Sequence, residues 1–376
     1  MKDTTKFIGL DVSKEKIAVA IADEGRDTPR YFGMIDNIPE DLRKLVMKLG
    51  DPSSLKVCYE AGSTGYGIYR LLTSIGVNCE VIAPALIPKR AGDRVKTDRR
   101  DALRLASLYR AGELTAVHVP SEEDEILRDL IRAREDAKED LLRAKHRLTK
   151  FLLRRDIHPP HSIKRKWTIA YREWLYKLSF ESSTLNLVFQ EYYQQVTELE
   201  QRIQRLEKEI QRQAEEGFHA PIIQALQVLR GVSVLTATGL TAEICSFVRF
   251  NKAGQFMANA GLVPSESSSG PLRNQGEITK TGNKHVRKLL IESAWSYRYK
   301  PAVRGDLKKR QEGQPASITA ISWKAQQRLH QKYNRLLARG KPSGKAITAI
   351  ARELAGFVWA IAREVELEKI KETQAA

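Results

Sequence analysis

Carboxylates in three separate stretches of the sequence have the residue types and spacing to bind a divalent cation. Asp11 lies at the end of the apolar run KFIGLDV, and Glu60 follows another apolar run, LKVCY. Asp98 and Asp101 lie three residues apart in KTDRRDALRLA, so a helix would present both on one face. Mg²⁺ prefers oxygen ligands and keeps water and phosphate oxygens around it. If the three stretches meet, the four acids predict phosphoryl transfer with one or two Mg²⁺ ions.

Each of these acids also has an ordinary explanation as part of a turn, a helix cap or a salt bridge. Asp98 could cap the helix that starts there, with Asp101 completing a variant of the capping box. Four neighbouring carboxylates without a cation would repel one another and raise one another's pKa values. The set of two acids at strand ends and two on a helix therefore favours a metal site.

The first third of the chain alternates between strand and helix patterns. Helical spacing is predicted at 39–49, in the segment through Leu72, and from Lys96 onward. Consecutive strands followed by an alternation of helices and strands predict a mixed sheet with helices packed on it. In such a sheet the ends of the strands lie near one edge, and the helix that follows can bring its first turn there. The strands are predicted at 6–12, 17–22, 31–35, 55–59 and 79–83.

The middle third is charged and reads as helical. A stretch without Gly or Pro predicts a helix from Ser121, a good N-cap, to about Arg155. Trp167 and Trp174 follow it and could stack on bases, although core packing is the commoner role of tryptophan. A second helix, 184–216, carries a heptad seam, which favours a coiled coil over a helix packed on one domain. The seam consists of Phe189, Tyr192, Val196, Leu199, Ile203, Leu206 and Ile210.

The last third combines a glycine turn, a serine-rich loop and a basic segment. Residues 228–237 place Gly231 between two helices, as in a helix-hairpin-helix element with amides that could face a phosphate. A Gly/Ser-rich loop, 261–276, is expected between helices, and a last amphipathic helix at 344–366. ITKTGNKHVRKLL reads as a turn leading into a helix, which favours phosphate binding. The residues predicted to contact nucleic acid are Arg99, Arg100, Arg104, Lys280, Lys284, Arg287 and Lys288.

The composition sets the broad class of the protein. Its 376 residues suggest two or three domains, and 42% hydrophobic residues are typical of a folded chain. The formal net charge of +17 is spread along the chain and favours a nucleic-acid partner. No apolar run approaches the roughly 18 residues that span a bilayer, and the N-terminus lacks the apolar core of a secretory signal. Three widely spaced cysteines indicate buried free thiols at Cys58 and Cys79, so we expect a cytoplasmic protein without a membrane partner.

Segments across nearly the whole chain resemble one family. GLDVSKEKIAVAI, VCYEAGSTGYGIYRLL and KTDRRDALRLA are similar to the RuvC-like DEDD domain of insertion-sequence transposases that recombine DNA under the direction of a bridge RNA. LRGVSVLTATGLTAEI, RFNKAGQFMANAGLVPSESSSG and GEITKTGNKHVRKLLIESAW resemble the transposase domain of that family. The resemblance implies an α/β plus α chain. Its parts would be a ribonuclease H-like (RuvC-like) mixed-sheet domain at 1–118, a helical coiled coil at 119–218 and a mostly helical C-terminal domain at 219–376.

The resemblance also implies a serine nucleophile that works with the acidic site. The matching serine stands before a glycine and after Gly-Leu-x-Pro, which selects Ser269, with the adjacent Ser268 as the alternative. A serine hydroxyl needs a base, a metal or nearby positive charge to become nucleophilic. Its attack on DNA would give a covalent phosphoserine linkage. The implied partners are donor and target double-stranded DNA, a non-coding guide RNA, and further copies of the chain in a homodimer or homotetramer.

Three functions can be separated by the residues that they require. An RNA-guided recombinase needs the four acids and Ser269, whereas a DEDD nuclease that activates water needs only the acids. A non-catalytic RNA-binding scaffold needs neither. The complete acidic set argues against the scaffold, and the serine loop with its basic flank argues against the nuclease. His285 could carry a proton, but a structural or phosphate-contacting role is favoured because no orienting partner is evident near it.

Overall fold

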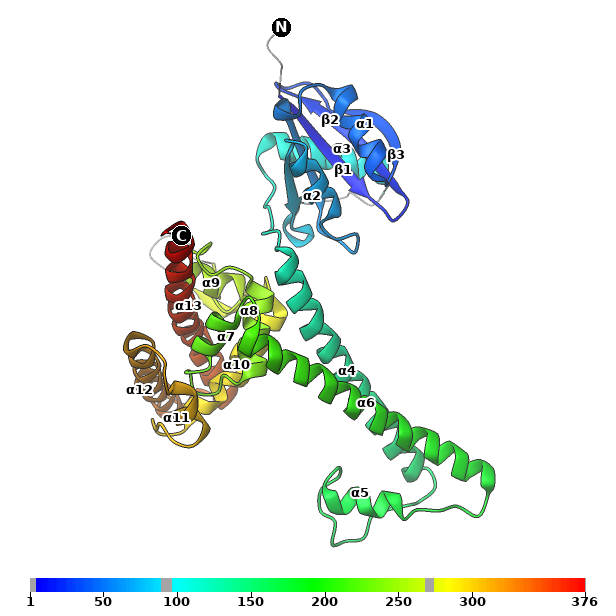
Figure 1. Cartoon of the computed structure of the whole chain (residues 1–376), viewed down its shortest axis with the longest axis vertical. Helices are drawn as coiled ribbons and strands as arrows, with labels where there is room; N and C mark the ends of the chain where they lie inside the picture. Colours follow the sequence, from blue (N-terminus) through cyan, green and yellow to red (C-terminus); the bar gives the residue numbers. More distant parts are fainter. Residues whose placement is uncertain (1–4, 89–96, 268–273, 376) are drawn as a thin grey trace. The chain divides into compact units, whose positions relative to one another are not determined.

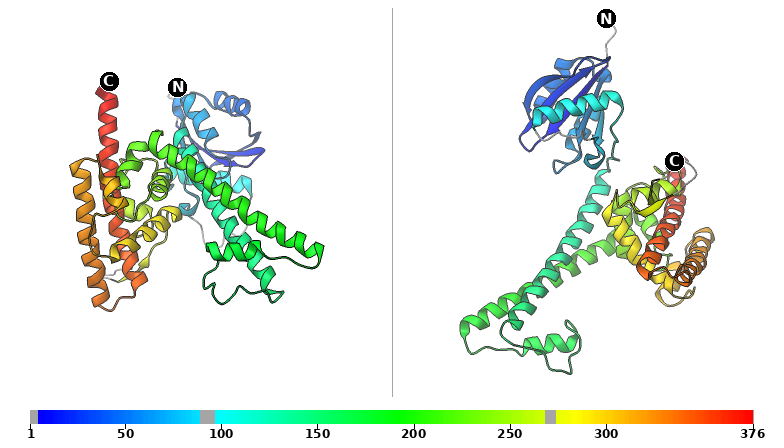
Figure 2. Two further views of the ribbon diagram at one scale, coloured as in Figure 1. Left: turned by 60° about the horizontal axis from the view of Figure 1, so that its bottom comes forward. Right: turned by 180° about the vertical axis from the view of Figure 1, so that it is seen from behind.

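The computed structural model describes residues 5–88, 97–267 and 274–375. The chain divides into two compact units, Met1–Val119 and Pro120–Ala376. Figure 1 labels their helices and strands, and Figure 2 shows them from two further directions. Over the described residues, no helix is both long enough and apolar enough to cross a membrane.

The first unit is built on a mixed five-stranded sheet in the order β3-β2-β1-β4-β5. β1 pairs antiparallel with β2 and parallel with β4; β2 pairs antiparallel with β3, and β4 parallel with β5. The predicted mixed sheet and its five strands are confirmed. The strands are β1 (Lys6–Val12), β2 (Lys16–Asp23), β3 (Arg30–Asp36), β4 (Leu55–Glu60) and β5 (Asn78–Ile82). The helices are α1 (Pro39–Leu49), α2 (Gly67–Ser74) and α3 (Asp98–Ala111), with short 3₁₀ turns at Pro52–Ser54 and Pro84–Leu86.

Side-chain alternation divides the sheet between two helical layers. Leu10 and Tyr59 face a core that α1 and α2 complete, whereas Gly9 and Cys58 face α3 on the other side. A Cβ at Gly9 would lie 2.4 Å from the backbone nitrogen of Ala106, so only glycine lets α3 pack this closely. Figures 1 and 2 show α1 and α2 on one face of the sheet and α3 across the other.

The second unit begins with two long antiparallel helices, α4 (Glu122–Leu153) and α6 (Ser183–Glu216), which lie side by side in both figures. Ser121 caps α4, as predicted, and forms a capping box with Asp124. Trp167 precedes the short helix α5 (Ile169–Tyr176) and Trp174 lies within it. Both pack against Tyr171, in agreement with the core-packing interpretation.

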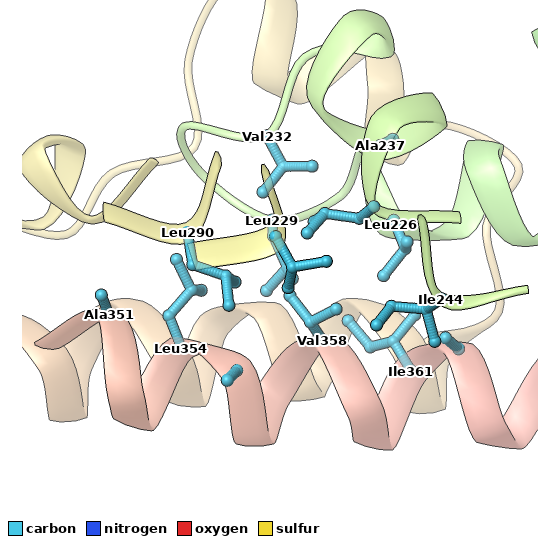
Figure 3. Close-up of a cluster of buried hydrophobic side chains, with 14 of the residues drawn as sticks. Leu226, Leu229, Val232, Ala237, Ile244, Leu290, Ala351, Leu354, Val358 and Ile361 are labelled. Carbon is cyan, nitrogen blue, oxygen red and sulfur yellow. The ribbon is translucent and has the colours of Figure 1, made fainter. Parts of the chain in front are cut away.

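The rest of the second unit is mostly helical, and several of its helices pack against α13 (Ser343–Ala375). Figure 3 shows Leu354, Val358 and Ile361 of this helix against Leu226 and Leu290 from two other helices. Leu127 of α4 and Ile210 of α6 join the same buried cluster, so the long helices share a core with the C-terminal segment. The remaining elements are α7 (Ala220–Leu226), α8 (Val234–Ile244), α9 (Ala253–Asn259), β6 (Pro264–Glu266), β7 (Gln275–Ile278), α10 (Lys284–Ala294), η3 (Trp295–Arg298), α11 (Asp306–Gln311), α12 (Ala316–Ala338) and α13 (Ser343–Ala375).

The predicted turn at Gly231 joins α7 to α8 with a positive φ of 80°, and its backbone is pressed against Ser293. The long helix α12 was not predicted. Cys58, Cys79 and Cys245 are buried free thiols, and burial raises the pKa of Cys79 to about 12.

Candidate active site

Asp11 and Glu60 lie at the carboxyl ends of neighbouring parallel strands. The register of β1 and β4 pairs Leu10 with Tyr59, so Asp11 and Glu60 are the next residue on each strand. Since side chains alternate and Gly9 and Cys58 face α3, both acids point to the α3 face. Neighbouring strands are about 4.8 Å apart, and both acids are half-buried. The sheet therefore brings these two distant acids to one edge.

Helix α3 brings its first turn to the same edge. Phe7, at the beginning of β1, contacts Tyr109 near the end of α3, with ring centroids 5.9 Å apart. Gly9 lies against Ala106, so α3 runs antiparallel to β1 and its start lies towards Asp11. Asp98 is exposed on the first turn; Asp101 is half-buried, with its Oδ2 atom shielded from solvent.

The N-cap of α3 is Thr97. Its side chain accepts a hydrogen bond from the backbone N–H of Arg100 at 3.4 Å. Asp98 is the first residue of the helix, so the interpretation of Asp98 as the cap, with Asp101 in a capping box, is wrong. The sequence placed the cap one residue too late because Thr and Asp are both good caps and stand side by side. The acids are therefore not needed to begin this helix.

The four acids do not form a closed metal cage. Among the residues that the structure describes, no group of three His, Cys, Asp or Glu side chains lies close enough to hold a metal ion. Mg²⁺ does not require such a group, because it keeps several waters and often binds through one or two carboxylates plus substrate phosphates. The oxygen donors at this edge fit that chemistry, and the magnesium site stays a prediction.

The loop with the predicted serine nucleophile extends from a short β-hairpin. Ser269 and Ser268 themselves lie outside the described residues. The loop was predicted as irregular chain between helices, but β6 and β7 pair within it. Ser267 N–H donates to Asn274 O at 3.0 Å, and Thr279 N–H donates to Val263 O at 2.9 Å. The hairpin was missed because its strands are short and polar.

The start of α10 is anchored by a buried carboxylate. The amide of Asn283 donates to Glu243 Oε2 at 2.7 Å, while its carbonyl oxygen caps α10 by accepting from the N–H groups of His285 and Val286. Arg132 Nε of α4 donates to the other oxygen of Glu243 at 3.0 Å. Burial tends to raise the pKa of Glu243, but the donors Arg132 and Asn283 outweigh it and the pKa is lowered.

His285 has an orienting partner that the sequence did not reveal. Its Nδ1 atom lies 2.7 Å from Glu135 Oε2 on α4, 150 positions earlier in the chain. The expectation that no such partner exists was therefore wrong. The contact occupies Nδ1 and ties the first turn of α10 to α4, as a positioning role requires.

Comparison with known proteins identifies the family. Residues 8–156 match a family profile described as a transposase and named for DEDD transposases of IS110, and residues 223–306 match the profile "Transposase IS116/IS110/IS902 family". The chain is 43% identical over 364 residues to "Putative transposase y4qE" of Sinorhizobium fredii, covering 95% of this chain and 88% of that protein. It is 34% identical over 339 residues to "Transposase for insertion sequence element IS1533" of Leptospira borgpetersenii, covering 89% and 97%.

The chain belongs to the IS116/IS110/IS902 family of transposases. Its activity is therefore DNA transposition, and DNA is its substrate. The first matched region contains all four acids of this transposase, and the second contains the β6–β7 hairpin, Glu243 and Asn283.

The predicted basic residues of the transposase differ in their surroundings. Arg99 lies over the ring of Tyr31, with its guanidinium carbon 5.2 Å from the centroid, and Arg104 donates to the carbonyl of Pro88. Arg287 donates to Ala260 O at 3.0 Å and so braces the turn before the hairpin. Lys280 is exposed and lies 3.5 Å from Glu277. The side chains of Arg100, Lys284 and Lys288 are exposed. Contact of these residues with nucleic acid stays a prediction.

Three residues that position the start of α10 in the transposase were not found from the sequence. Arg132 and Glu135 lie on a highly charged helix, where their pattern resembles a solvated face. Glu243 did carry a signal, because it is the one acid in the otherwise apolar run VLTATGLTAEICSF. A lone acid in such a run needs a buried partner.

Proposed function

We propose that this transposase cuts and rejoins DNA at a composite site of carboxylates and a serine. Asp11, Glu60, Asp98 and Asp101 would bind one or two Mg²⁺ ions, and Ser269 would be the nucleophile. The observation that supports this proposal is that the register of β1 and β4 and the packing of α3 on Gly9 direct Asp11, Glu60 and the first turn of α3 towards one edge of the sheet. The strand order β3-β2-β1-β4-β5, with three antiparallel strands first, supports a ribonuclease H-like fold.

The chemistry is a transesterification. The Ser269 oxygen bonds to the phosphorus of a DNA phosphodiester as the bond from that phosphorus to a deoxyribose oxygen breaks, and the departing oxygen takes up a proton. The phosphoserine linkage keeps one ester bond for each one broken, so a DNA hydroxyl can reverse the step without ATP. Bound Mg²⁺ would stabilise the negative charge that develops on the phosphate oxygens.

The partners follow from the resemblance. A non-coding bridge RNA would select the donor and target DNA by base pairing, and two or four copies of the chain would assemble. The heptad seam of α6 is partly accounted for within one chain, since Phe189, Val196 and Ile210 are buried in it. Assembly would therefore use other surfaces, and Leu142 and Leu187 are exposed on the two long helices.

The test uses the purified protein with the element's non-coding RNA, donor and target DNA, and Mg²⁺. Products are run on a denaturing gel with and without protease, for wild type, Ser269→Ala and Asp11→Ala. We expect a protease-sensitive protein–DNA adduct that both substitutions abolish, and no recombination when the RNA is left out. Recombination that persists without RNA would contradict the guided mechanism.

A hydrolytic nuclease is the second candidate, because all four acids lie in the first compact unit and the serine hairpin lies in the second. Such an enzyme would activate water and leave no adduct. Cleavage that survives Ser269→Ala but is lost in Asp11→Ala would establish it. Binding of RNA without any DNA cleavage in wild type would favour the non-catalytic scaffold.

A further inference from the structure

A basic groove lies beside the hairpin, within the second unit. Its cavity of about 620 Å³ lies between the β6–β7 hairpin and the first turns of α13. Lys280 and Glu277 line it from the hairpin side, and Lys341, Lys345 and Arg352 line it from the other. All of these residues belong to the second unit and are described by the structure.

The charges of this groove are concentrated and largely uncompensated. Within the described chain, no carboxylate forms an ion pair with Lys341, Lys345 or Arg352. Glu353, the neighbour of Arg352, is held away from the groove by α12, where it accepts from Arg328 Nε at 2.9 Å and pairs with Lys332. The side chain of Glu277 lies 3.5 Å from Lys280. The lining therefore has four cations against one carboxylate.

The spacing of the cations suits a linear anion. Lys345 and Arg352 are seven residues apart on one face of α13, which places them about 10 Å apart along the helix axis. Gly344 adds no side chain, and a Cβ there would meet nothing within 4 Å, so the groove is open at this end. Cations held side by side with only one carboxylate among them favour a polyanion whose phosphates replace several counterions at once.

We infer that this groove binds the phosphodiester backbone of one DNA strand next to the hairpin that carries the serine loop. The inference rests on the proposed function, in which Ser269, between β6 and β7, attacks the DNA. Because the β6–β7 hairpin forms one side of the groove, the DNA strand to be cut is the expected ligand. An RNA strand offers the same phosphates and is the competing outcome of the test.

The test measures binding without chemistry. Full-length protein with Ser269→Ala is titrated, in EDTA, against fluorescent single-stranded DNA and against RNA of the same sequence, at several salt concentrations. Lys345→Gln and Arg352→Gln are each expected to reduce the slope of log K against log salt for DNA by about 0.7, the value for one phosphate contact on a single strand. Lys324→Gln, an exposed lysine on α12 outside the groove, is the matched control and should leave the slope unchanged.

Unchanged DNA slopes in both groove variants, or a change for RNA alone, would overturn the inference. Lys341→Gln serves as a further variant if the half-buried Arg352 proves necessary for folding, which thermal melting would reveal. The adduct assay separates this inference from the proposed function. If wild type forms no protein–DNA adduct but the groove variants show reduced salt slopes for DNA, the proposed serine mechanism fails and the groove remains a DNA-binding site. If the groove variants show the salt slope of wild type and wild type forms the adduct, the groove does not bind DNA and the proposed recombinase mechanism still holds.

Discussion

Helices α3 and α10 both begin beside candidate site residues, α3 at the acids and α10 after the serine hairpin. The cap of α3 is local, a single hydrogen bond of 3.4 Å from Arg100 N–H to Thr97. The cap of α10 accepts two hydrogen bonds, at 2.9 and 3.1 Å, and is itself held by Glu243, forty residues earlier. α3 is instead positioned by close packing on β1 at Gly9.

The comparison shows two ways of placing a functional residue. Packing of backbone on backbone positions the acids, so added volume should disturb them while polar changes should not. Buried polar contacts position the start of α10, so loss of a charge or a hydrogen bond should disturb it. The following predictions test this distinction.

The largest effect is expected from Glu60→Gln. If the strand register makes Asp11 and Glu60 partners, the rate of DNA cleavage should fall at least ~10²-fold, as in Asp11→Asn, because a charged oxygen ligand is lost. The melting temperature should stay close to that of wild type. Glu80→Gln on β5, an acid registered opposite Cys58, is the matched control. Normal cleavage by Glu60→Gln together with an inactive Asp11→Asn would contradict the conclusion that the β1–β4 register places the two acids in one site.

Gly9→Ala tests packing directly. The new methyl group would lie 2.4 Å from Ala106 N and 2.5 Å from Ala102 O, so α3 must move away from the sheet. We expect the first unit to lose about 1–3 kcal/mol of stability and the transposase to lose cleavage activity. Hydrogen exchange of the α3 amides measures the first effect. Gly67→Ala, where a Cβ meets nothing within 4 Å, should change stability by less than about 0.5 kcal/mol.

Glu243→Gln tests the polar anchor through its pH dependence. Because the folded pKa of Glu243 is lowered, its charge stabilises the fold above the unfolded value of about 4.3, and this stabilisation is lost as the pH falls through the folded pKa. At pH 7 the variant should lose about 1–3 kcal/mol, less than a fully buried pair because Arg132 is 48% exposed. The difference in free energy of unfolding between Glu243→Gln and wild type, measured by denaturant unfolding, should disappear below pH 4. A gap independent of pH would show that the charge is not what anchors α10.

The smallest effects come from the caps themselves. Asn283→Ala removes the cap of α10 and one donor to Glu243, and should cost about 1–2 kcal/mol. Thr97→Ala removes one long hydrogen bond and should cost about 0.5 kcal/mol. Both are measured by denaturant unfolding of the full chain. Equal costs would remove the distinction between the two helices.

Local patterns predicted the strands of the first unit because alternation of apolar residues reports directly on sheet burial. They also predicted α4, α6 and α13, the N-cap Ser121 and the burial of Cys58 and Cys79, but they missed α12. They did not predict the β6–β7 hairpin, whose strands are short and polar, nor the partner of His285. Glu135 is one acid among many on α4, and local spacing carries no information about a contact 150 positions away.

By itself, the sequence determined which residues could do chemistry, because residue type and spacing identified the acids at the ends of apolar runs as candidates. Only the tertiary structure decided how they are placed: which face of the sheet Asp11 and Glu60 share, which direction α3 takes over Gly9, and which carboxylate holds Asn283. The physical reason is that alternation and helical periodicity are properties of neighbouring residues, whereas strand register, close packing and buried ion pairs join segments that the chain brings together only when it folds.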